Sequence, residues 1–62
     1  QAWHGTDRQC RGVLLDRVRQ TPGGVQVDVA LTAWADEEQA RRCLDGLLAD
    51  ELVRRTGSLL RL

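Results

Sequence analysis

Side chains capable of acid–base or nucleophilic chemistry are few in this chain of 62 residues. His4 is the single histidine, so it would have to serve as general base for any nucleophile such as Cys10 or Ser58. A zinc site would need His4 together with two distant thiols and a carboxylate. The chain also has no nucleotide-binding, metalloprotease or Cys-x-x-Cys motif. We therefore predict a non-catalytic chain that binds no metal and no cofactor.

Arginine is the residue type that could carry a function. Nine arginines balance nine acidic residues, so the formal net charge is zero. Dedicated nucleic-acid binders usually have a strong basic excess, because phosphate contacts dominate their affinity. The candidates for such contacts are nevertheless clear, namely Arg41, Arg42, Arg54, Arg55 and Arg61. We predict that alanine at both Arg54 and Arg55 lowers nonspecific DNA affinity and flattens its salt dependence.

Two of these arginines have acidic neighbours at helical spacing. Glu37 precedes Arg41 by four residues and Glu38 precedes Arg42 by four, and each such pair stabilises a helix by about 0.2–0.5 kcal/mol. A recognition helix usually meets bases with its N-terminal residues, yet this helix would begin with Asp36 and the two glutamates. A solvated, salt-bridged face is therefore favoured over base reading for Arg41 and Arg42. The arginines further along the chain have no such partners.

The first helix is expected after an unpatterned stretch, Gln1 to Gly5, which we interpret as a linker to a domain spanning residues 6–62. Thr6 and Gln9 have the spacing of a capping box. Apolar residues then recur on one face of the predicted helix, at Cys10, Val13, Leu14, Leu15 and Val18. The turn-forming residues Thr21 to Gly24 should end this helix.

The segment after this turn is compatible with two structures. Val25 to Leu31 alternate apolar and polar residues as a half-buried strand would, yet the apolar spacing from Ala30 to Trp34 suits a short helix. We predict a brief extended piece at Val25–Gln26, followed by a second helix that starts near Val27. Little more than Ala35 should separate it from the third helix.

The third helix and the C-terminal segment have clearer signals. Asp36 is a good N-cap, and Gln39 follows three residues later. The apolar face comprises Ala40, Cys43, Leu44, Leu47 and Leu48. Leu52 to Arg55 and Leu59 to Leu62 then suggest a β-hairpin around a Thr56–Ser58 turn. Helix, extended piece, two helices and a hairpin form a winged helix-turn-helix, an α+β fold that is mostly α.

Tryptophan and cysteine are expected to mark the interior. Trp34 is the one large residue between two amphipathic helices and is predicted to fill the core. Trp3 is predicted to be exposed in the linker. Cys10 and Cys43 could form one disulfide, but free cysteine also behaves as a small buried hydrophobe, and a reduced pair is favoured.

No stretch approaches the ~20 apolar residues of a membrane span and no signal peptide is visible, which favours a cytoplasmic protein. The start at Gln1 suggests a piece of something longer.

The opening block is distinctive as a string, namely Gly5–Gln9, Arg11–Gly12 and Leu14–Asp16. Two later strings are Trp34–Asp36 and Leu44–Val53, and the second of these is an amphipathic helix running into a strand, which many winged helices share. Together they resemble the C-terminal domain of some bacterial A/G-specific adenine DNA glycosylases, which remove adenine mispaired with guanine or oxidised guanine in base excision repair. The resemblance implies that the active site, the helix-hairpin-helix DNA contact and the four cysteines of a 4Fe-4S cluster lie in a preceding catalytic domain. Cys10 and Cys43 lack the close spacing of the cysteines that bind that cluster, so we do not expect them to be cluster ligands.

Three functions are compatible with these observations. The resemblance implies a non-catalytic C-terminal winged-helix domain that makes an auxiliary contact, either with double-stranded DNA, weakly and nonspecifically, or with the parent catalytic domain. One alternative is a protein-interaction module that never touches DNA. The other is the DNA-binding domain of a small transcription regulator, for which the acidic start of the third helix is a poor fit. None of the three requires a membrane or a small-molecule substrate.

Overall fold

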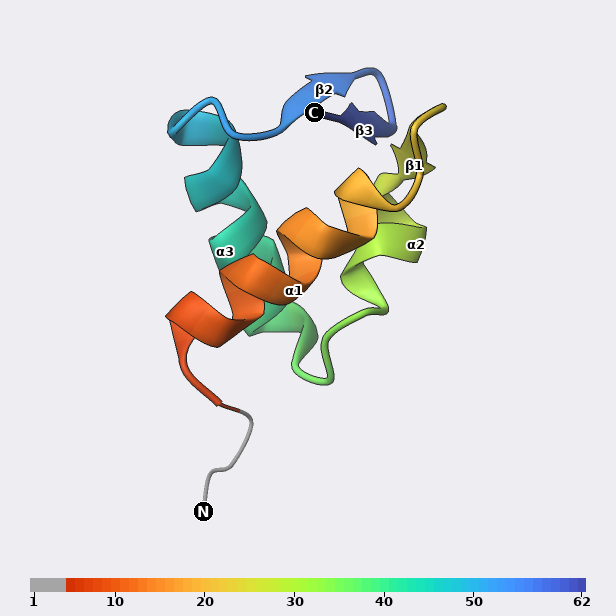
Figure 1. The fold of residues 1–62 in the computed structure, drawn as a ribbon. Coiled ribbons are helices and arrows are strands. Elements are labelled where there is room, and N and C mark those ends of the chain that lie inside the picture. Colours follow the sequence, from red (N-terminus) through yellow and green to blue (C-terminus); the bar gives the residue numbers. More distant parts are fainter. Residues whose placement is uncertain (1–4) are drawn as a thin grey trace.

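The computed structural model describes residues 5–62, so the predictions for Trp3 and His4, and for all of the linker except Gly5, lie outside the described residues. The elements follow in the order α1 (Asp7–Arg19), β1 (Val25–Gln26), α2 (Val27–Leu31), α3 (Glu37–Ala49), β2 (Arg54–Thr56) and β3 (Leu59–Arg61). The strands form one antiparallel sheet in the order β1-β3-β2. Figure 1 shows this sheet at one end of the domain, away from the start of α1. The predicted winged-helix layout is confirmed.

Helix α1 begins at the predicted capping box. The Thr6 side chain accepts from the Gln9 amide at 3.1 Å, and the Gln9 side chain accepts from the Thr6 amide at 2.9 Å. The buried stripe consists of residues four apart, Cys10, Leu14 and Val18. Val13 was predicted on the same face but is 37% exposed, because successive residues are rotated by about 100° on a helix and position 13 lies beside the stripe.

The connection between α2 and α3 is longer than predicted. Helix α2 starts at Val27 as expected but ends at Leu31, and five residues, 32–36, lead to α3. The amides of Thr32, Ala33 and Trp34 each donate to the carbonyl three residues earlier. This tighter hydrogen bonding ends the α-helix before Trp34. Trp34 is half-buried and packs against the edge of the core, so it does not plug the centre as predicted.

Gln39 is the one buried polar side chain among the described residues, with 8% of its surface exposed. Its Oε1 accepts from Trp34 Nε1 at 2.8 Å. Its Nε2 donates to the Gly5 carbonyl at 3.3 Å and to Asp7 Oδ1 at 2.9 Å. Gln39 therefore ties the start of α1, the α2–α3 connection and the start of α3 together.

The core lies between the three helices and the central strand, where Leu14, Leu47 and Leu60 are almost fully buried. Cys10 and Cys43 are also buried there and are both free thiols, so the reduced pair, not the disulfide, is present. Burial, and to a smaller extent a hydrogen bond with Cys43, raises the pKa of the Cys10 thiol to about 12. A thiol held protonated and inaccessible in this way is a structural residue and not a nucleophile.

The hairpin starts later than predicted, at Arg54 instead of Leu52. Residues before it close α3, because the Glu51 amide donates to the Leu48 carbonyl at 3.1 Å and the Leu52 amide to the Leu47 carbonyl at 3.0 Å. This pair of bonds is a Schellman motif, which requires a left-handed residue that is usually glycine. Here that residue is Glu51, with φ 61°.

Candidate nucleic-acid interface

The two candidate arginines of α3 are both neutralised by acids. Arg41 pairs with Glu37 at 2.7 Å, as predicted. Arg42 was predicted to pair with Glu38, but it donates to Asp7 of α1 at 2.9 Å instead. The start of α1 packs against α3 here, since Gln39 holds the same Asp7 carboxylate, and hydrogen bonds from Gln39 and then Arg42 lower the pKa of Asp7. Each of these arginines therefore presents a carboxylate beside its guanidinium, which weakens its attraction for a phosphate.

The exposed surface of α3 has further acidic groups. Glu37, Glu38 and Asp45 are exposed on this helix, and the Asp36 side chain caps its first turn by accepting from the Gln39 amide at 3.1 Å. A helix with these carboxylates would repel a DNA backbone in the position from which recognition helices read bases. The α3 face therefore does not have the electrostatics of a major-groove reading surface.

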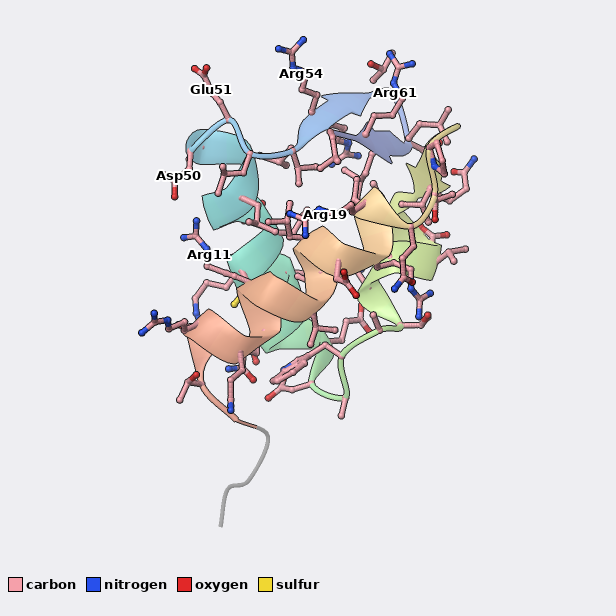
Figure 2. All side chains as sticks on the ribbon, in the orientation of Figure 1. Arg11, Arg19, Asp50, Glu51, Arg54 and Arg61 are labelled. Carbon is pink, nitrogen blue, oxygen red and sulfur yellow. The ribbon has the colours of Figure 1, made fainter. Side chains whose placement is uncertain are left out.

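The outer face of the wing has the opposite character. Arg54 of β2 lies directly opposite Arg61 of β3 in the antiparallel register, and both are exposed. Figure 2 shows the two side chains pointing away from the helices. Cross-strand partners share a face, and like charges directly opposite one another destabilise a sheet. Within residues 5–62 neither guanidinium has an acidic partner within salt-bridge distance.

Arg55 lies on the other face of the hairpin. It is opposite Leu60, which is fully buried, and adjacent residues of a strand point to opposite faces. Its Nε donates to the Gly57 carbonyl at 2.8 Å, across the turn. The structure thus brings Arg54 and Arg61 together but separates Arg55 from them.

One arginine that the sequence did not single out lies beside this pair. Arg19, the last residue of α1, shares a groove of about 460 Å³ with Arg61. Sequence spacing offers no signal for this proximity, because 42 positions separate the two residues and the contact depends on how β3 packs over α1.

A second groove, of about 750 Å³, lies on the outer side of α1. Its lining includes Gly5, Gly12, Val13 and Trp34. Gly12 lies inside α1, and a Cβ added to it would meet no heavy atom within 4 Å. Glycine in a helix interior costs about 0.5–1 kcal/mol relative to alanine, so nothing within the domain accounts for the small residue at this position.

The described residues have neither a metal site nor a membrane-spanning helix. Between residues 5 and 62, no three His, Cys, Asp or Glu side chains gather as ligands for a metal ion would. No helix in this part of the chain is both long and apolar enough to cross a bilayer. The arginine surfaces and the α1 groove are therefore the features of the described residues that could bind a partner.

Comparison with known proteins gives one consistent result. Over 57 residues the chain is 49% identical to the adenine DNA glycosylase of Mycobacterium tuberculosis, and over 60 residues it is 47% identical to that of Mycolicibacterium smegmatis. These matches take in 90% of the chain but only 19% and 20% of the relatives, so the chain spans about a fifth of their length. No protein-family model and no solved structure matches it. The resemblance predicted from the residues is confirmed.

Proposed function

We propose that this chain, a homologue of one segment of bacterial adenine DNA glycosylases, is a non-catalytic accessory domain that helps such an enzyme hold DNA. In this proposal it forms the C-terminal winged helix of a cytoplasmic base excision repair enzyme that removes mispaired adenine. The observation that carries the proposal is the Arg54–Arg61 pair, two like charges directly opposite each other on an exposed face without an acid between them.

The chemistry of the contact follows from the side chains. A guanidinium presents several N–H donors in a planar fork that matches the oxygens of a phosphate. An anion between Arg54 and Arg61 would remove their mutual repulsion and accept from both. The contact would be independent of base sequence, because phosphate contacts position a protein on DNA without reading it. Candidate base readers on α3 are held by acids, as Arg41 and Arg42 show.

The proposal assigns no cofactor to this domain. A 4Fe-4S cluster needs four cysteine thiolates, and the chain has two cysteines. Both are buried, with Cys10 on α1 and Cys43 on α3, and burial holds the pKa of Cys10 at about 12. These residues do not fit a cluster, so any cluster of the parent enzyme would be bound by its catalytic domain.

The test compares two arginine pairs that change the net charge equally. Arg54→Ala with Arg61→Ala removes the wing pair, and Arg41→Ala with Arg42→Ala removes the acid-paired arginines of α3. Affinity for a short DNA duplex, measured by fluorescence anisotropy over a range of salt concentrations, gives the salt slope. Each lost phosphate contact should flatten that slope by about 0.9, so we expect a change of roughly 1.8 for the wing variant. Equal slopes for both variants would contradict the proposal.

The Arg54–Arg61 pair replaces the Arg54–Arg55 pair suggested by the sequence, because Arg55 lies on the opposite face and donates to the Gly57 carbonyl. A phosphate contact from Arg55 itself stays a prediction. The single variant Arg55→Ala belongs in the same measurement, and we expect a smaller change in the salt slope from it than from Arg54→Ala.

A second candidate function is docking on the catalytic domain of the same polypeptide. The groove on α1 favours it, because Gly12 leaves open space beside the exposed Val13 and the half-buried Trp34. The occupant would be the remaining protein, since roughly four fifths of the relatives' length lies outside the matched segment. This groove is lined by different residues from the Arg54–Arg61 pair, so the two functions are compatible.

A further inference from the structure

Arg19 and Arg61 both line a groove whose lining has no acidic side chain. The groove of about 460 Å³ is lined by Val18, Arg19, Thr21, Pro22, Arg61 and Leu62. The end of α1 and the turn after it supply one side, and β3 with the C-terminal residue supplies the other. Figure 2 shows Arg19 on α1 beneath the wing from which Arg61 projects. Two arginines that line one groove without an acidic side chain leave a positive charge there, which an anion can neutralise.

The neighbouring acid does not neutralise Arg19. Asp16 lies one helical turn before it, but the Asp16 carboxylate accepts from the Gln20 side chain at 3.0 Å. Elsewhere on α1, Arg11 does have an acidic partner, Asp50. Within residues 5–62, Arg19 has no acid within salt-bridge distance.

The stem of Arg61 is held in place by the turn that precedes β1. A Cβ built at Gly24 would lie 3.3 Å from Arg61 Cγ and 3.5 Å from its Cδ, so the turn and this side chain are in close contact. Gly24 also has φ 104°, a conformation that side-chain-bearing residues rarely adopt. The backbone therefore packs along the aliphatic part of Arg61 and restricts its freedom, which lowers the entropy lost when its guanidinium binds an anion.

We propose that Arg19 and Arg61 bind neighbouring phosphates of one DNA strand along this groove, and that the contact continues through Arg61 to Arg54 on the wing. This inference rests on the proposed function and extends it from the hairpin to the end of α1. Each phosphodiester has two non-bridging oxygens and can accept two parallel hydrogen bonds from one guanidinium. The DNA backbone would then cross the domain along the row Arg19, Arg61 and Arg54, and α3 would stay clear of the bases.

The experiment removes Arg19 and compares it with an arginine at the other end of the same helix. Arg19→Ala and Arg8→Ala each remove one positive charge from an exposed position of α1. Binding to a short DNA duplex is measured over a range of salt concentrations, with circular dichroism to verify folding. We expect Arg19→Ala to flatten the salt slope by about 0.9, so that the affinity gained between about 1 M and 0.1 M salt falls roughly eightfold. Arg8→Ala should change this gain in affinity less than about twofold, because this variant loses only the long-range attraction of one charge for DNA.

The outcomes separate this inference from the function on which it rests. If removing Arg54 and Arg61 flattens the salt slope but Arg19→Ala does not, the groove contact is wrong and the wing contact stands. If neither change has an effect, both are wrong. Equal effects of Arg19→Ala and Arg8→Ala would show that only total charge matters, which also overturns the groove contact. A direct readout is the Arg19 Nε–Hε NMR signal, which should shift when the duplex is added and recover at high salt.

Discussion

The two ends of this domain differ in how their arginines are paired with acids. At the end where α1 and α3 begin, Arg41 and Arg42 each have an acid within 3 Å. Gln39 donates a further hydrogen bond to Asp7, the acid that pairs with Arg42. At the wing end, Arg54 and Arg61 lie opposite each other without an acidic partner among the described residues. A net charge of zero therefore conceals a difference in pairing, because the arginines at one end have acidic partners and two arginines of the wing have none.

This difference indicates which arginines are available for binding. The charge of an arginine already paired is partly offset by its acid, and the carboxylate beside it repels a phosphate, so the net attraction for a DNA backbone is weaker. Arg54 and Arg61 lose nothing when an anion arrives, and their repulsion is relieved. Local pairing therefore separates structural from functional arginines where composition alone cannot.

The largest effect is expected from Gln39, at the neutralised end. Gln39→Leu removes the acceptor of Trp34 Nε1 and the donors to Gly5 and Asp7. Leaving partly buried polar groups without partners should lower the free energy of unfolding by about 1–3 kcal/mol. Urea denaturation measures this change, and Gln20→Leu is the control, because Gln20 is exposed and bonds only Asp16 within the described chain. A loss below about 0.5 kcal/mol, the usual range for surface substitutions, would show that Gln39 does not hold this end together.

A smaller effect is expected at the junction between α3 and the wing. Glu51 has φ 61°, and a left-handed conformation costs a residue with a side chain about 1 kcal/mol relative to glycine. Glu51→Gly should therefore raise the free energy of unfolding by up to about 1 kcal/mol. Glu51→Ala keeps the backbone cost and should change it little. Thermal denaturation of the two variants makes the comparison, and equal stabilities would argue against a strained junction.

The smallest effect contrasts the two ends directly. Arg61→Glu places an acid opposite Arg54, and a cross-strand pair of opposite charges contributes about 0.2–1 kcal/mol. The domain should become more stable by about that amount while its DNA affinity falls. Arg41→Glu should lower the stability of the domain, because it places a second acid four residues after Glu37 on α3. If Arg61→Glu destabilises the domain, Arg54 and Arg61 do not repel each other as the register implies.

Features encoded by near neighbours were predictable from sequence. The capping box of Thr6 and Gln9, the Asp36 cap and the change from strand to helix at Val27 all depend on residues within a few positions. The Glu37–Arg41 pair is of the same kind. Each is decided by local backbone geometry, which a short stretch of sequence specifies.

Features that depend on how elements pack were not predictable. Arg42 pairs with Asp7, 35 positions away, because α1 crosses the start of α3. The pairing of Arg54 with Arg61, and not Arg55, depends on the register of the hairpin. Arg19 joins this surface only because β3 lies over the end of α1. Charge spacing along a chain cannot show these contacts, since each is set by tertiary structure.

The most direct test of the account is an NMR titration of the domain with a short duplex that contains an adenine–oxidised guanine mispair, at low and at physiological salt. We predict that shifts at low salt concentrate on Arg19, Arg54 and Arg61 and fade as salt rises, while Arg41 and Arg42 stay unchanged. The account would be contradicted if no signal shifts at low salt, or if the strongest shifts lie at the start of α3. The first of those results would leave docking through the α1 groove as the function to pursue.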